Sequence, residues 1–262
     1  MNVKPMTPLM MARVGARLLL LQARWDPARM QGAGFAYALE PWLAVCWAAE
    51  PAALLEARRR HLEYFNTHPI AAWLAAGVVC RQEADASAAT GERRDAAIAR
   101  IRSFKITLGA SLAGLYDSFF WGALRPASAL AGILTAQAAY ALGSARPLAW
   151  TCAAALLAYN VPAFAARVTG LRRGWAEGER AVASLVKLPV QPWIRGLRRA
   201  TVGAALVAFA AAIMPLDGRA RLTAGLTFTA GLILTWRGVS PLAQLGFAGL
   251  GGMAASAAGL WR

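Results

Sequence analysis

Residues 61–69 are His-Leu-Glu-Tyr-Phe-Asn-Thr-His-Pro, a polar run between two apolar stretches. The rest of the chain is strongly apolar, with 58% hydrophobic residues and a mean hydropathy of +0.43. A soluble domain is roughly half apolar, so this composition favours a membrane protein. Polar side chains beside lipid-buried segments are costly, and they usually line a pathway, contact a partner or hold a substrate. The run 61–69 is therefore predicted to be a functional region of a membrane protein.

Five apolar windows approach the roughly 20 residues that a helix needs to cross a bilayer. They are residues 127–144, 147–166, 200–216, 222–236 and 241–261. Shorter apolar stretches at 18–21, 35–49 and 70–80 favour interfacial or re-entrant helices instead. The sequence thus predicts an all-α integral membrane protein. Amphipathic and re-entrant helices form its first half, and about five transmembrane helices follow.

Composition changes near residues 124–127, which predicts a motif-bearing part at 1–126 and a transmembrane part at 127–262. The stretch Lys105–Pro126 is long enough to cross but is interrupted by glycines and charges. Irregular backbone is tolerated at membrane depth only where protein or a wet cavity satisfies it, and transporters build binding sites from such segments. Glycines also let helices pack closely. Two interpretations of this stretch therefore remain open: a binding site and a helix that packs closely against its neighbours.

The formal net charge of +15 comes from basic residues that lie between apolar segments. This pattern indicates the basic cytoplasmic loops of a multi-pass membrane protein and no nucleic-acid partner. Lysine and arginine concentrate at 81–105 and 167–199, so both segments are predicted to be cytoplasmic and the C-terminus to lie outside. Residues 81–103 are predicted to form a solvated loop or short helix.

Catalytic and metal-binding patterns are missing from the sequence. Cys46, Cys80 and Cys152 are scattered without zinc-site spacing, and His61 and His68 are the only histidines. The two histidines would share a face on a continuous helix, which Pro69 disfavours. We expect no metal, no cofactor and no catalytic nucleophile.

Asn66, Thr67 and His68 support two interpretations. Asn or Thr side chains accept hydrogen bonds from exposed N–H groups, so they suit the cap of a helix that begins near Pro69. Their clustering beside Glu63 also suits a hydroxyl-rich ligand or a subunit interface, because both need paired donors and acceptors.

Asp117, Trp121 and Arg125 recur every four residues and would form one stripe on an α-helix. Asp117 is expected to neutralise Arg125 or Lys105, and Trp121 to stack on a sugar face. A structural ion pair with interfacial aromatic packing is the alternative. Glu83 is expected either to pair with a nearby arginine of its loop or to lie on a solvated face.

Four blocks resemble the IID subunit of the mannose/fructose/sorbose family of the bacterial phosphotransferase system. The first, Gln22–Ala38, resembles the family pattern Q-x-x-W-N-x-x-R-M-Q-x-x-G-F. The second, Arg60–Pro69, resembles R-H-L-E-F-F-N-T-x-P, and Glu83 falls at the first glutamate of the family's E-E pair. The fourth, Lys105–Pro126, resembles K-V-G-L-M-G-P-L-A-G-x-G-D-x-x-F-W-G-T-x-R-P.

The resemblance implies a multi-pass subunit of the bacterial inner (plasma) membrane that contacts membrane lipid. With a IIC subunit it would form a hetero-oligomer that translocates a hexose-type sugar, and soluble IIA and IIB phosphocarriers would supply the phosphoryl group. The subunit itself would carry no catalytic nucleophile. The candidate pathway residues are Asn66, Thr67, His68, Lys105, Asp117, Trp121 and Arg125. Glu63 and Glu83 would support the pathway or an interface.

The chain departs from the family pattern at several positions. Ser111 replaces a proline and Tyr116 replaces a glycine, so the local backbone there is expected to differ. Asp26 replaces an asparagine, Ala84 replaces the second glutamate, and the polar insertion near Asp217 is short. These departures motivate an alternative function, a regulatory or scaffolding complex for IIA and IIB without sugar transport.

Overall fold

The computed structural model describes residues 5–215, 218, 222 and 224–230, and these residues are helical apart from short connections. The helices are α1 (Pro8–Leu18), α2 (Gly32–Cys46), α3 (Pro51–Leu62), α4 (Ala71–Ser87), α5 (Gly91–Tyr116), the π-helix η1 (Asp117–Leu124), α6 (Arg125–Ala141), α7 (Pro147–Glu177), α8 (Glu179–Val186) and α9 (Val190–Ile213). The prediction of an all-α protein is confirmed over the described residues.

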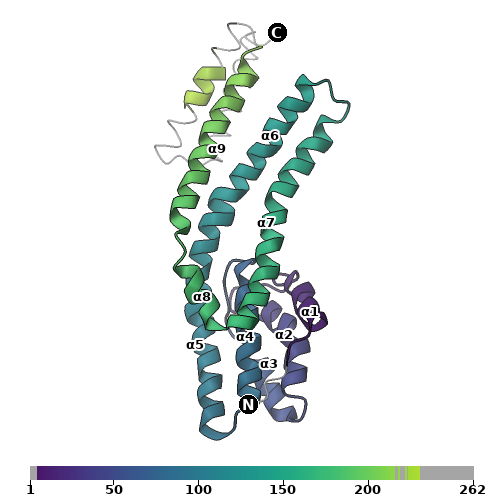
Figure 1. The fold of residues 1–262 in the computed structure, drawn as a ribbon, viewed down its shortest axis with the longest axis vertical. Coiled ribbons are helices and arrows are strands. Elements are labelled where there is room, and N and C mark those ends of the chain that lie inside the picture. The colour runs from purple at the N-terminus through teal and green to yellow at the C-terminus, as the bar shows by residue number, and fades with distance from the viewer. Residues whose placement is uncertain (1–4, 216–217, 219–221, 223, 231–262) are drawn as a thin grey trace. The chain divides into compact units, whose positions relative to one another are not determined.

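The chain forms two compact units, residues 1–201 and 202–262, and the site described below lies entirely within the first. The predicted division into 1–126 and 127–262 stays a prediction. Within the first unit, α6 and α7 run side by side, and α1 to α4 gather around the lower part of α7 in the view of Figure 1.

The core of the first unit is built around α2 and α4. Phe35, Leu39 and Trp42 of α2 are buried, and the Trp42 indole N–H donates to the Cys80 carbonyl of α4 at 2.7 Å. A helix that is apolar on all sides is buried by its neighbours. Residues 35–49 and 70–80, predicted to be interfacial or re-entrant, thus pack largely inside a helical bundle, and their position relative to the membrane stays a prediction.

Two described helices, α7 and α9, are long and apolar enough to cross a membrane. Large apolar side chains of α7 are exposed, among them Leu148, Leu156 and Phe164, as expected for a surface that faces lipid. The windows 127–144, 147–166 and 200–216 correspond to α6, the first part of α7 and the last part of α9. The window 222–236 lies partly, and 241–261 wholly, outside the described residues.

The charged segments are mostly helical, and a helix was one of the two alternatives predicted for residues 81–103. Residues 81–105 belong mostly to the end of α4 and the first half of α5, and residues 167–199 to α7, α8 and α9. Charged pairs four residues apart, Arg81 with Asp85 and Arg173 with Glu177, stabilise these helices on their exposed faces. The charge clusters thus lie largely on the exposed faces of helices.

The stretch 105–126 also stays helical, but its hydrogen-bonding pattern changes in η1. Pro126 has no N–H to donate to the carbonyl of Gly122, four residues earlier. That carbonyl instead accepts from Arg198 Nε of α9 at 2.9 Å, and the Ser118 carbonyl accepts from the same guanidinium at 3.3 Å. The expected interruption is therefore a π-helix stabilised by one arginine, a feature often found at functional sites.

Candidate functional site

Glu83 of α4 is the centre of a buried polar cluster. Its carboxylate accepts two hydrogen bonds of 2.7 Å from Arg60 and one of 2.9 Å from His61 Nε2, both on α3. The Trp47 indole N–H donates a fourth at 2.8 Å. The side chains of Arg60, His61 and Glu83 are at most 3% exposed. The expectation that Glu83 pairs with an arginine of its own loop or lies on a solvated face is wrong.

The protonation states in this cluster follow from its contacts. Burial alone raises the pKa of Glu83, but hydrogen bonds from Arg60 and His61 outweigh it and lower the pKa to about 2, so the carboxylate is ionised. Burial lowers the pKa of His61, so the ring is neutral and its Nε2–H donates to Glu83. His61 Nδ1 then carries only a lone pair, which fits its lack of a partner among the described residues.

Lys105 of α5 extends the cluster. It is 4% exposed, and its ammonium donates to the backbone carbonyl of Arg60. Asp117 makes no ion pair with Lys105 or Arg125 in the described part of the chain, so the predicted neutralisation by Asp117 is wrong. Glu63, the neighbour of this cluster in sequence, is exposed and pairs with Arg102 at 3.4 Å.

Gln31 joins the first two sequence blocks. Its side-chain amide donates to the Thr67 carbonyl at 2.7 Å and accepts from the Thr67 N–H at 3.0 Å. The backbone continues this pairing, because Gln31 N–H donates to the Phe65 carbonyl at 2.8 Å. Both Gln31 and Thr67 are buried. Thr67 therefore fixes the connection between α3 and α4, and its hydroxyl has no partner among the described residues.

Replacing Gln31 with leucine is expected to lower the free energy of unfolding by about 2–4 kcal/mol, because it leaves the buried N–H and C=O of Thr67 unsatisfied. Thermal unfolding of the purified chain in detergent measures the change. Gln22→Leu, at an exposed glutamine, is the matched control. Equal shifts for the two variants would contradict the role given to Gln31.

The start of α4 differs from the predicted cap. The Ile70 N–H donates to His68 Nδ1 at 3.1 Å, and the Ala72 N–H to the His68 carbonyl at 3.0 Å. Asn66 is exposed and makes no side-chain hydrogen bond with the described residues. Capping by Asn66 or Thr67 is therefore wrong, and His68 performs that role. The α3 helix ends at Leu62, so His61 and His68 do not share a helix face.

His68 also brings the second and fourth sequence blocks together. Its ring stacks on Phe120 of η1 with centroids 5.6 Å apart, and it lies 5.0 Å from the Trp121 ring and 5.9 Å from Tyr116. His68 Nε2 is buried without a partner in the described chain. Half of the Trp121 surface remains exposed, so this ring is held on one side and open on the other.

The open side of Trp121 faces a hollow of about 350 Å³ between η1, α6 and α7. Polar groups from α6 and α7 line it: Arg125, Ser128, Tyr159 and Asn160. Of the predicted stripe, Trp121 and Arg125 line this hollow and Asp117 does not. A π-helix pairs residues five apart instead of four, so the α-helical spacing fails here.

Sequence reasoning missed Tyr159 and Asn160. Both lie inside the apolar window 147–166, where a polar pair followed by Pro162 is a recognisable signal. The Asn160 amide N–H donates to the Leu156 carbonyl at 2.9 Å, which leaves its side-chain oxygen available as an acceptor. The hollow therefore offers an aromatic face, a guanidinium and amide and phenol groups to a polar ligand.

This chain is similar in sequence to known membrane subunits of sugar transport systems. The sequence profile described as PTS system mannose/fructose/sorbose family IID component matches residues 6–209. The mannose-specific EIID component of Escherichia coli (strain K12) is 33% identical over 159 residues, 61% of this chain and 52% of the relative. The fructose permease IID component of Bacillus subtilis (strain 168) is 30% identical over 174 residues, 64% and 56% of the two chains. The chain thus spans about half the length of the curated relatives it matches.

Two solved structures share the fold. One, described only as a membrane protein, superposes with a TM-score of 0.73 at 23% identity and covers 98% of each chain. The other, the mannose transporter ManYZ in complex with microcin E492, gives a TM-score of 0.56 at 24% identity, again over 98% of each chain.

Proposed function

This chain belongs to the PTS system mannose/fructose/sorbose IID family, and on that premise we propose that it is the IID-type membrane subunit of a sugar transporter. With a IIC partner it translocates a hexose-type sugar, coupled to phosphorylation by soluble IIA and IIB phosphocarriers. The complex is a hetero-oligomer of the bacterial inner membrane. Residues 81–105 and 167–199 face the cytoplasm, because both segments are rich in arginine.

The hollow beside Trp121 is the observation that carries this proposal. Its volume of about 350 Å³ lies within the roughly 300–1,000 Å³ of small-ligand pockets. Sugars present apolar C–H faces, which pack on aromatic rings, and hydroxyls, which need both donors and acceptors. Trp121 supplies the ring, Arg125 supplies donors, and Asn160 supplies an acceptor.

The surroundings of Trp121 suit a fixed binding wall. His68 packs against the Trp121 ring and is itself stacked on Phe120, and Arg198 holds the backbone carbonyls of Ser118 and Gly122 in η1. A site whose side chains are held by packing and by a second layer of hydrogen bonds binds with less loss of entropy. The hollow is open on its other side, which fits a pathway completed by the IIC partner.

Trp121→Ala and Asn160→Leu are each expected to reduce sugar uptake at least tenfold in vesicles that contain the reconstituted complex with its IIC partner. The reason is that a carbohydrate left without its stacking face or hydroxyl partner loses on the order of 1.4 kcal/mol or more. Uptake and phosphorylation of radiolabelled sugar measure the effect. Trp150→Ala, at an exposed tryptophan of α7 outside the hollow, is the control.

Unchanged sugar uptake in both Trp121→Ala and Asn160→Leu would contradict the proposed binding site. Asn66→Ala and Asp117→Asn test the sequence candidates that lie outside the hollow. Wild-type rates with both changes would remove these two residues from the pathway, while a tenfold loss would extend the pathway toward them.

A second function, a regulatory or scaffolding complex, is favoured by Tyr116. This residue stands where the family has a glycine, and its ring packs against His68 and Phe120 beside the proposed pathway. The regulatory function predicts that deletion of the chain alters phosphorylation-dependent regulation without lowering the uptake of any sugar. Lower uptake after deletion would instead support transport.

A further inference from the structure

An apolar groove of about 690 Å³ lies between α1 and α7, with Trp73 of α4 in its lining. It shares no lining residue with the hollow beside Trp121. The wall formed by α1 carries small side chains, Ala12, Gly15 and Ala16, which leave the space between the two helices open. The opposite wall is one stripe of α7: Phe164, Val168, Leu171 and Arg172. We call this space the α1–α7 groove.

The α1–α7 groove lies where α7 changes from apolar to charged sequence. Residues 148–166 carry no charged side chain, and Arg167, Arg172 and Arg173 follow. In a membrane helix such a change marks the boundary between the hydrocarbon core and the polar headgroups. Phe164 and Arg172 are about 12 Å apart along the helix axis. The groove therefore extends from the level of the acyl chains to the level of the headgroups.

Both walls of the groove continue into apolar surface. Phe164 is 55% exposed and follows the exposed Leu156 on α7, the helix long and apolar enough to cross the membrane. On α1, Leu9 and Leu19 are more than half exposed, and Arg13 is exposed as well. Exposed leucines combined with basic residues are typical of a helix that lies in the membrane surface. The groove is thus continuous with surface that suits lipid.

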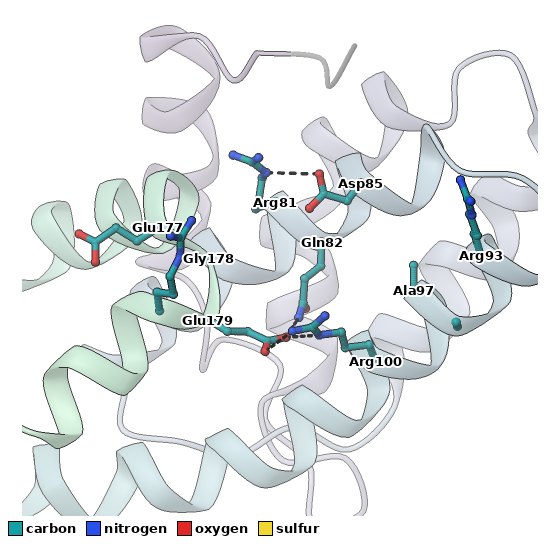
Figure 2. A pocket seen from close by; sticks show the side chains of 11 residues that line it. Arg81, Gln82, Asp85, Arg93, Ala97, Arg100, Glu177, Gly178 and Glu179 are labelled. Carbon is teal, nitrogen blue, oxygen red and sulfur yellow. Dashed lines mark hydrogen bonds and ion pairs between the residues drawn. The ribbon is translucent and has the colours of Figure 1, made fainter. Parts of the chain in front are cut away.

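Arg172 places a positive charge at one end of the groove. Its side chain is exposed and makes no ion pair with the described residues. Other guanidiniums in this region are neutralised: Arg173 pairs with Glu177 at 2.8 Å, and Figure 2 shows Arg100 bound to Glu179 at 2.7 Å. Guanidinium donors form strong charge-assisted hydrogen bonds with phosphate oxygens. Arg172 therefore suits an anionic headgroup.

We propose that the α1–α7 groove binds an anionic phospholipid of the surrounding bilayer, with one acyl chain between the two helices and the phosphate at Arg172. Arg172 is the one charged residue among the described lining residues, and the others are apolar. A soluble phosphate compound would match only Arg172, and an apolar peptide would match only the walls. Basic pockets beside membrane helices are known to select such headgroups. This inference requires that α7 lies in the membrane and does not depend on sugar transport.

Photo-crosslinking of the complex with its IIC partner tests the proposal. The complex is placed in phosphatidylcholine nanodiscs that contain a small fraction of phosphatidylglycerol with a photoreactive group in one acyl chain. Phosphatidylcholine with the same photoreactive chain is the zwitterionic probe. Mass spectrometry of the peptides measures the crosslinking yield at the groove. We expect both α1 and α7 to be labelled beside the groove, and more strongly by phosphatidylglycerol.

Arg172→Gln is expected to lower the preference for phosphatidylglycerol over phosphatidylcholine about fivefold, because one basic residue near the membrane surface favours anionic lipid by roughly this factor. Arg172→Lys retains the charge and is expected to retain most of the preference. The control is Arg199→Gln, at an exposed arginine of α9 outside the groove.

Ala16→Phe tests the acyl-chain part. The added ring occupies the groove, and displacing about two CH₂ groups of the lipid chain is expected to lower the labelling by both probes about tenfold. Ala200→Phe, at an exposed alanine of α9, is the matched control. Arg172 is exposed, so Arg172→Gln tests the site even where Ala16→Phe disturbs folding.

Labelling of the exposed α7 surface without labelling of the groove would mean that the IIC partner covers the groove, and would overturn the proposal. Equal labelling by the two probes would overturn the anionic headgroup. A loss of preference in Arg199→Gln as large as in Arg172→Gln would show a diffuse charge effect and overturn the role of Arg172. Groove labelling that depends on Arg172, in a complex that takes up no sugar, would support the lipid site and contradict transport alone.

Discussion

Glu83→Gln is expected to lower the free energy of unfolding by about 3–5 kcal/mol, one of the two largest effects in this chain. Glutamine keeps the shape of the side chain but removes its charge. The guanidinium of Arg60, 2% exposed, then stays buried without a counter-ion. The indole N–H of Trp47 and His61 Nε2 also lose a charged acceptor, which weakens both bonds.

Thermal and chemical unfolding of the purified chain in detergent measures this loss. Glu92→Gln, at an exposed glutamate of α5, is the matched control and is expected to change stability by less than about 0.5 kcal/mol. Stability equal to the wild type in Glu83→Gln would contradict the central role of the cluster.

The same cluster predicts a pH dependence. The folded chain lowers the pKa of Glu83 to about 2 from an ordinary value of 4.5. A carboxylate with a lowered pKa contributes stability that is fully present above pH 4.5 and is lost as the pH falls through about 2. The wild type is therefore expected to lose more stability than Glu83→Gln between pH 4.5 and pH 2. An equal loss of stability in the wild type and in Glu83→Gln over this pH range would contradict the lowered pKa of Glu83.

The buried cluster also shows what the sequence alone cannot provide. Arg58, Arg59 and Arg60 are consecutive and look equivalent in the sequence, but successive helical residues point in different directions. Arg58 pairs with Glu40 and Arg59 with Glu56, both on the surface, and only Arg60 turns inward to Glu83. That choice depends on the packing of α2 against both α3 and α4, which brings Arg60 to Glu83.

The long apolar windows predicted the helices, and the long irregular motifs predicted the family. The helical class, and the windows that became α6, α7 and the end of α9, follow from apolar length alone. Of the pathway candidates, His68 contacts Trp121, and Trp121 and Arg125 line one hollow, while their part in a pathway stays a prediction. Asp117 was misplaced because an α-helical period was assumed across the π-helix that Pro126 favours.

Gly77→Ala is expected to cost about 3 kcal/mol or more, at the upper end of the usual range for overpacking. Gly77 of α4 and Gly174 of α7 face each other at a close helix crossing. A methyl group at residue 77 would lie closer than 3.0 Å to the Leu171 carbonyl and the Trp175 nitrogen, which are backbone atoms of α7. No side-chain rotation relieves such a clash, so the two helices must separate.

Separation of α4 and α7 would have effects beyond stability, because α4 carries Glu83 and α7 carries Tyr159 and Asn160. We therefore expect lower thermal stability and lower uptake together. Gly196→Ala in α9 is the control, since no atom lies within 4 Å of an added methyl group there. Alanine has the higher helix propensity by up to about 1 kcal/mol, so this control is expected to be neutral or stabilising. We therefore expect Gly77→Ala to lower thermal stability and Gly196→Ala to leave it unchanged or raise it. An equal loss of stability in both variants would mean that close packing at residue 77 is not what requires glycine.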